Sequence, residues 1–167
     1  MLKNLSMATL VVAAAALMVP AEADATVAQN GAGACQGALP VYATNLRARP
    51  LGINNEGTSG AYVSCSLHTI DLYQADNAVN GLMLSNGGGA DADVDCVLVS
   101  SGSDLGSASY FPKSITVPAG ASKVELSWDP AADNGGANFP NTMNYSCLLP
   151  PGIDVNYVFS NLEPIPT

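Results

Sequence analysis

The segment 55–67 reads NEGTSGAYVSCSL, and the segment 86–98, which begins 31 residues later, reads NGGGADADVDCVL. Each segment opens with an Asn-x-Gly turn signal and continues into a run in which Val, Cys and Leu alternate with other residues. A looser third copy begins at Asn134 and ends with Tyr145-x-Cys147-x-Leu149. Because side chains alternate between the two faces of a strand, each cysteine falls on the apolar face of a half-buried strand. The three copies therefore predict an all-β fold with cysteines in its core.

Turn signals recur about every 8 to 15 residues along the rest of the chain. We expect hairpins at three of them, 54–57, 86–89 and 118–120, because Asn and Gly tolerate the positive φ angles of tight turns. The 31-residue offset then indicates two related hairpins stacked in two sheets. Pro112 indicates an edge strand or a bulge, since proline cannot donate to a strand ladder. The pattern predicts a single antiparallel β-sandwich, immunoglobulin-like or jelly-roll-like, with about eight to ten strands.

The first 25 residues have the layout of a secretory signal peptide. Lys3 gives a positive start, and a nearly uninterrupted apolar run follows over residues 7–19. This run is too short to span a bilayer as a stable helix. Small-x-small motifs end at Ala23 and at Ala25, and we expect cleavage after Ala25, with Ala23 as the alternative. The sequence thus predicts export to the periplasm or to the outside of the cell.

The mature chain, residues 26–167, has the length of one domain, and we expect loose ends at 26–36 and 161–167. It keeps 12 acidic and 4 basic residues, which gives a formal charge of −8. This charge repels nucleic acid and anionic membrane surfaces. The mature sequence contains no second apolar segment, so we expect no stable insertion into a membrane. The partner classes that remain are an extracellular polymer or an envelope protein.

Four cysteines follow the predicted cleavage site: Cys35, Cys65, Cys96 and Cys147. An even number of cysteines in an exported chain predicts disulfides, and four cysteines allow three pairings. We prefer Cys35–Cys65 with Cys96–Cys147, although the sequence leaves the other two pairings open. Zinc and thioredoxin-like redox motifs are excluded, because no two cysteines are closely spaced and His68 is the only histidine.

His68 also limits the catalytic hypotheses. Any Ser-His-Asp site would have to use it, with Asp71 to orient the ring, but the chain has no Gly-x-Ser-x-Gly elbow. We therefore expect no catalytic residues and no enzyme, with a hydrolase that uses His68 as the minor alternative.

Two groups of acidic residues are candidates for calcium, and the sequence suggests no other cofactor. The row Asp91–Asp95 places three carboxylates along one strand face, which spreads them apart and favours a solvated acidic surface. The loop residues Asp129, Asp133 and Asn134 can curl their oxygens toward one ion. Turn formation explains the same loop residues without an ion.

Aromatic residues supply the candidate ligand platforms. Tyr62 lies opposite the apolar face of its strand and is the preferred platform for a glycan. Trp128 shares a face with apolar neighbours, which favours the core. Tyr110, Tyr157 and Phe139 are placed near loops.

The stretch Lys113–Ser122, followed by Val124–Trp128, resembles a hairpin common in bacterial immunoglobulin-like and jelly-roll modules. The segments Ala34–Cys65 and Ser146–Gly152 resemble small exported proteins of Gram-negative bacteria that carry no assigned function. The resemblance implies the fold and lends no activity. We expect a non-catalytic binding or structural component of the envelope or extracellular matrix. The alternative is a carbohydrate-binding module with an aromatic platform, with or without the assistance of calcium.

Overall fold

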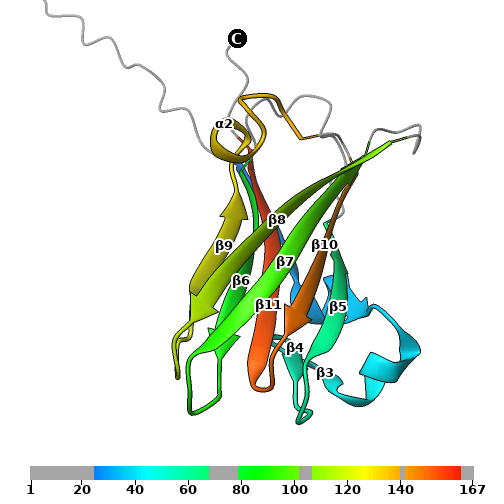
Figure 1. Ribbon diagram of the computed structural model, residues 1–167, viewed down its shortest axis with the longest axis vertical. Coiled ribbons are helices and arrows are strands. Elements are labelled where there is room, and N and C mark those ends of the chain that lie inside the picture. The colour runs from blue at the N-terminus through cyan, green and yellow to red at the C-terminus, as the bar shows by residue number, and fades with distance from the viewer. Residues whose placement is uncertain (1–24, 68–78, 102–106, 140–141, 163–167) are drawn as a thin grey trace, which may run out of the picture.

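The structure, a computed structural model, describes residues 25–67, 79–101, 107–139 and 142–162. In these ranges, eleven strands form two antiparallel sheets that pack face to face (Figure 1). The six-stranded sheet contains β1 (Ala25–Asn30), β3 (Leu46–Arg49), β4 (Gly52–Asn55), β6 (Val79–Asn86), β9 (Val124–Trp128) and β11 (Ile153–Leu162). The five-stranded sheet contains β2 (Cys35–Gly37), β5 (Ala61–Ser66), β7 (Ala92–Ser101), β8 (Ala108–Val117) and β10 (Thr142–Leu149). Three helical turns lie between strands: α1 (Gly31–Ala34), η1 (Pro40–Thr44) and α2 (Pro130–Asp133).

The strand order is that of a jelly roll. Strands β4 to β11 form two groups of four, ordered β4-β11-β6-β9 and β5-β10-β7-β8. The chain changes sheet at every connection in this set except the one between β7 and β8. Two sheets connected in this way make a double-sheet jelly roll. The predicted antiparallel sandwich is therefore confirmed, and the jelly roll is the form that it takes.

The N-terminal part of the domain is more ordered than its sequence suggests. We expected a loose end over residues 26–36, but β1 pairs with β11 along its whole length and β2 pairs with β5. These strands, together with β3, raise the number of strands to eleven. Backbone hydrogen bonds hold β1, and such pairing leaves little trace in the side-chain pattern of a short edge strand. At the other end, β11 continues to Leu162.

The prediction of three hairpins was wrong. The turns at 54–57, 86–89 and 118–120 connect strands that belong to different sheets. Consequently the two 31-residue copies are not stacked hairpins, and their cysteine strands β5 and β7 lie in the same sheet. A turn signal marks a reversal of the chain, but it does not tell whether the next strand pairs with the last one or crosses the core. Pro112 does lie on an edge strand, because β8 pairs only with β7 among the described strands.

Two buried asparagines explain the repeat. Asn55 donates from Nδ2 to the carbonyl oxygens of Ser59 (2.9 Å) and Leu149 (2.7 Å), and its Oδ1 accepts from the amide of Gly57 (3.0 Å). Asn86 makes the same three kinds of bond 31 residues later. Its partners are the carbonyl oxygens of Ala90 and Val117 (both 2.9 Å) and the amide of Gly88 (2.8 Å). Each side chain shapes its own loop and ties that loop to the end of a strand in the opposite sheet.

Backbone bonds join the sheet-crossing loops to one another. The Gly87 amide donates to the Gly152 carbonyl (2.9 Å), and the Gly152 amide donates to the Asn55 carbonyl (2.8 Å). Gly152 has a φ of 83°, and a Cβ atom there would lie 3.0 Å from the amide nitrogen of Gly88. Glycine is required at this position because both the φ angle and the close approach exclude a side chain. Figure 1 shows these loops gathered at the lower end of the sandwich.

The core lies between the sheets, and the cysteines are part of it. The disulfides are Cys35–Cys65 and Cys96–Cys147, the same pairs that the sequence analysis preferred, and each joins residues that face one another on adjacent strands. Both lie within the five-stranded sheet, so they clamp β2 to β5 and β7 to β10. Trp128 is fully buried, as predicted, and its Nε1 donates to the carbonyl oxygen of Phe111 (2.8 Å). No helix of the described ranges is long and apolar enough to span a membrane.

We predict that Asn86→Ala lowers the free energy of unfolding by about 3 kcal/mol, because it removes three hydrogen bonds and leaves buried backbone groups unpaired. Urea denaturation of the oxidised protein measures this change. The matched control is Asn134→Ala in the third copy, where the half-buried side chain bonds, among the described residues, to the carbonyl oxygens of Ala137 and Asn138 in its own loop. The control should lose less than about 1 kcal/mol. Equal losses in the two variants would contradict the structural role of Asn86.

Candidate functional site

The calcium candidates form a capped helical turn. Asp129 caps α2, since its Oδ1 accepts from the amide of Ala131 (2.7 Å). Asp133 accepts at Oδ2 from the Lys113 ammonium and from the Asp129 amide, both at 2.8 Å. Asn134 directs its Nδ2 to carbonyl oxygens of its own loop. In the part of the chain that the structure describes, no three His, Cys, Asp or Glu side chains are grouped to hold a metal ion.

The Lys113–Asp133 pair connects the edges of the two sheets. Lys113 extends from β8 and also donates to the carbonyl oxygen of Ser127 on β9 (2.7 Å). Burial raises the pKa of Asp133, but the hydrogen bonds from Lys113 and the Asp129 amide, together with the charge of Lys113, more than offset this and hold the pKa below its ordinary value. The ionised carboxylate is therefore the form that the fold stabilises.

The three aspartates of the acidic row, at and just before β7, each accept a hydrogen bond from β8 or from the turn that follows it. Asp93 and Asp95 accept from the hydroxyls of Thr116 and Ser114 on β8, both at 2.6 Å. Asp91 accepts from the amide of Ala119 (2.9 Å). All three aspartates are exposed on the outer face of the five-stranded sheet.

Tyr62 lies on that same outer face. Its side chain is 42% exposed, and its ring contacts the ring of Tyr42 from η1, with centroids 5.7 Å apart. Leu39, which precedes η1, is also exposed, and so is Val41 within η1. The structure thus gives Tyr62 an aromatic partner that the sequence analysis did not anticipate. His68 and Asp71 lie outside the described residues.

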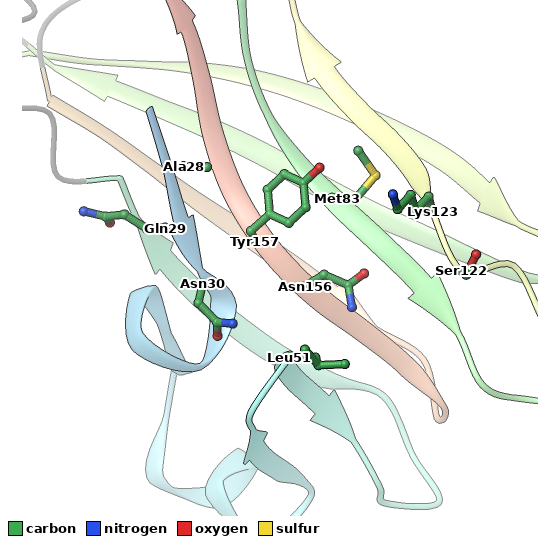
Figure 2. A pocket seen from close by; sticks show the side chains of 9 residues that line it. All are labelled: Ala28, Gln29, Asn30, Leu51, Met83, Ser122, Lys123, Asn156 and Tyr157. Carbon is green, nitrogen blue, oxygen red and sulfur yellow. The ribbon is translucent and has the colours of Figure 1, made fainter. Parts of the chain in front are cut away.

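A second surface, on the outer face of the six-stranded sheet, is hollowed into a trough of about 440 Å³ (Figure 2). Its walls come from β1, the β3–β4 turn and the two residues just before β9, and its floor comes from β6 and β11. The lining residues are Ala28, Gln29, Asn30, Leu51, Met83, Ser122, Lys123, Asn156 and Tyr157. This volume lies within the range of small-molecule sites in proteins.

Tyr157 forms the centre of the floor. It lies opposite Asn30 on β1 and opposite Met83 on β6. Its ring packs edge-on against Phe159, with centroids 6.2 Å apart. Figure 2 shows the Tyr157 ring standing between the two walls, with Met83 on one side and Asn30 on the other. The trough therefore offers an apolar ring and a thioether, framed by polar side chains.

Asn156 is the extra residue of a β-bulge in β11. The pairing register with β6 shifts between Val155 and Tyr157. On its other edge, β11 changes partner at the same point: Val155 pairs with β4, whereas Tyr157 pairs with β1. Bulges commonly re-aim a side chain. Here the bulge places Asn156 in the lining of the trough, next to the ring of Tyr157.

Two glycines allow this bulge. A Cβ atom on Gly31 or on Gly52 would lie only 2.1 or 2.4 Å from the carbonyl oxygen of Val155. The backbones of α1 and β4 therefore approach β11 more closely than any side chain permits. Asn30 and Leu51, which directly precede these two glycines, lie in the wall of the trough.

The side-chain oxygen of Asn156 is buried and has no hydrogen-bond partner among the residues that the structure describes. By contrast, both polar atoms of the Asn30 side chain, on the wall of the same trough, have hydrogen-bond partners. Nδ2 donates to the Pro50 carbonyl (3.0 Å), and Oδ1 accepts from the Ala32 amide (2.8 Å). A buried amide oxygen without a partner costs about 1–3 kcal/mol. Such a group in a native structure calls for an explanation, and a donor supplied by a ligand is one.

From the sequence, Tyr157 is expected only as an aromatic residue near a loop. One signal for the bulge was present, because the buried residues Val155 and Val158 are three positions apart and break the alternation of β11. A strand with period two would place one of them outward. The walls of the trough come from distant segments, and their meeting is not readable from sequence.

Of the comparisons with known proteins, the one with solved structures bears on the fold. No protein-family profile matches the chain, and no curated protein matches it. Among solved structures, the chain is similar to a xylan-binding module, CBM15, with 11% identity and a TM-score of 0.50 over 86% of this chain and 100% of that one. It also matches a family 11 carbohydrate-binding module from Clostridium thermocellum in complex with a mixed-linked tetrasaccharide, with 10% identity and a TM-score of 0.40 over 86% and 91%. At such identities, the likeness to the xylan-binding module supports the β-sandwich fold alone.

We predict that Asp133→Asn lowers the free energy of unfolding by about 1 kcal/mol at pH 7. Because the pKa of Asp133 in the folded state lies below its ordinary value of 3.8, its contribution is complete above that value and is lost as the pH falls through the lower pKa. Urea denaturation at pH 7 and at pH 3 tests this dependence. Asp93→Asn, which removes an exposed carboxyl, is the control and should change stability by less than about 0.5 kcal/mol. A loss that is the same at both pH values would contradict the pairing.

Proposed function

We propose that the protein is an exported, non-catalytic carbohydrate-binding protein and that the trough around Tyr157 is its binding site. The observation that carries the proposal is the buried, unpartnered oxygen of Asn156 beside an aromatic ring in an open trough. Sugars present both an apolar face of C–H groups and a rim of hydroxyls. The Tyr157 ring suits the first, and the Asn156 oxygen accepts from the second.

The composition of the trough supports binding rather than catalysis. The lining residues that the structure describes include no Asp, Glu, His or Cys, whereas glycoside hydrolysis generally uses a pair of carboxylates. The similarity of the fold to a xylan-binding module is in keeping with this proposal, although it concerns the fold alone. The two disulfides and the predicted signal peptide favour an oxidising compartment, the periplasm or the outside of the cell.

Tyr42 and Tyr62 give the alternative platform on the opposite sheet. The trough is favoured because it is concave and combines an aromatic ring with an unsatisfied polar group. The tyrosine pair therefore provides a matched comparison within the same protein.

We predict that Tyr157→Ala weakens glycan binding at least tenfold, because it removes the apolar surface at the centre of the site. Affinity electrophoresis through gels that contain xylan, mixed-linkage glucan, mannan or acidic polysaccharides provides the measurement. Tyr62→Ala is the control and should bind as the unchanged protein does. Loss of binding in Tyr62→Ala alone would move the site to the other sheet, and absence of binding to every polysaccharide would overturn the proposal.

We predict opposite effects of Asn156→Leu on stability and on binding. Replacing an amide whose buried oxygen is unpaired by an apolar side chain should leave the free energy of unfolding unchanged or raise it by about 1 kcal/mol. Glycan binding should weaken at least tenfold, because the acceptor for a sugar hydroxyl is gone. Urea denaturation and affinity electrophoresis on the same preparation separate the two effects. A destabilised variant with intact binding would show that Asn156 is a structural residue.

A further inference from the structure

We infer that the trough selects an acidic glycan, in which a uronate residue lies on Tyr157 and its carboxylate binds Lys123. The inference rests on the proposed function and names its ligand class. Lys123 is the only charged residue among the described residues that line the trough. A positive group at a binding site favours an anionic ligand through a charge-assisted hydrogen bond.

The other basic side chains of the described residues are already engaged. Arg49 forms an ion pair with Glu56, and Lys113 forms one with Asp133. Arg47 donates to backbone carbonyl oxygens, those of Ala43 and Leu46 (both 3.1 Å). Lys123 has no such bond to any described residue, so its ammonium is available to a ligand.

The placement of Lys123 fits a single sugar ring with two kinds of polar group. Figure 2 shows its nitrogen turned toward Met83 and the Tyr157 ring, while the Asn156 amide lies beside the same ring. A ring stacked on Tyr157 would have a cationic donor on the Lys123 side and an unpaired acceptor at Asn156. A uronate matches both, because it carries a carboxylate that accepts and hydroxyls that donate.

The trough carries a positive charge, whereas the molecule as a whole is acidic. The chain has 14 acidic and 5 basic residues, and the exposed row at Asp91, Asp93 and Asp95 covers part of the opposite sheet. The same sheet carries two acidic residues near the trough, Glu125, which pairs with Met83, and Asp154, two residues before Asn156, but neither lines the trough. An anionic polymer is therefore repelled by the aspartate face and meets a lone cation in the trough.

The test compares acidic polysaccharides with neutral forms of the same chains. Polygalacturonate, alginate and glucuronoxylan are each used in native form and after reduction of the carboxyl groups to alcohols, and binding is measured by affinity electrophoresis at low and moderate salt. We expect at least one native polymer to bind about tenfold more tightly than its reduced form, with a preference that salt diminishes. Lys123→Gln should abolish the preference. Arg47→Gln, which removes the same charge from a site outside the trough, should retain it.

Three outcomes decide between the two proposals. A preference for the native polymer that Lys123→Gln removes and Arg47→Gln keeps would support the acidic ligand. Equal binding of native and reduced polymers, or binding to neutral glycans alone, sensitive in either case to Tyr157→Ala, would overturn the acidic ligand and leave the carbohydrate-binding site in place. Absence of binding to all polymers, or binding insensitive to Tyr157→Ala, would overturn both.

Discussion

The buried side chains of Asn55 and Asn86 hold the chain where it crosses from one sheet to the other. Each one satisfies three backbone groups that would otherwise be unpaired, in loops that pack against one another at one end of the sandwich. Since a buried backbone group without a partner is costly, these loops depend on the two amides. The disulfides reinforce the five-stranded sheet, but they do not join it to the other sheet. The association of the sheets therefore rests on the asparagine-bound crossings and on the apolar core.

This arrangement also explains where the candidate site lies. β11 follows the crossing at Gly152. Within the six-stranded sheet, one edge of β11 pairs with β6, and its other edge pairs first with β4 and then with β1. The change of partner coincides with the bulge at Asn156, and the glycines of α1 and β4 close in on it. The trough is thus a consequence of how the N-terminal strands complete the jelly roll. Its polar centre is an unsatisfied group that the fold tolerates and that a ligand can satisfy.

The buried strands could be predicted from local sequence patterns, whereas the strand connections and the candidate site depend on contacts between distant segments. The alternation around Cys65, Cys96 and Cys147 predicted buried strands, because period two is a local property of the backbone. The same Asn-x-Gly signals led to hairpins that do not exist, since the destination of a crossing is set by the bonds of Asn55 and Asn86 to distant strands. Tyr62 was correctly placed on an outer face, whereas the site around Tyr157 depends on a bulge and on walls that come from distant segments.

The most direct measurement is a nuclear magnetic resonance titration of the isotopically labelled, oxidised protein with oligosaccharides from the polymer that binds best. If the trough is the binding site, the largest shifts occur at the side-chain amide of Asn156 and at the backbone amides of residues 28–30 and 156–157. The resonances of Tyr42 and Tyr62 stay in place. Shifts confined to Tyr42 and Tyr62, with the Asn156 amide unmoved, would contradict this assignment.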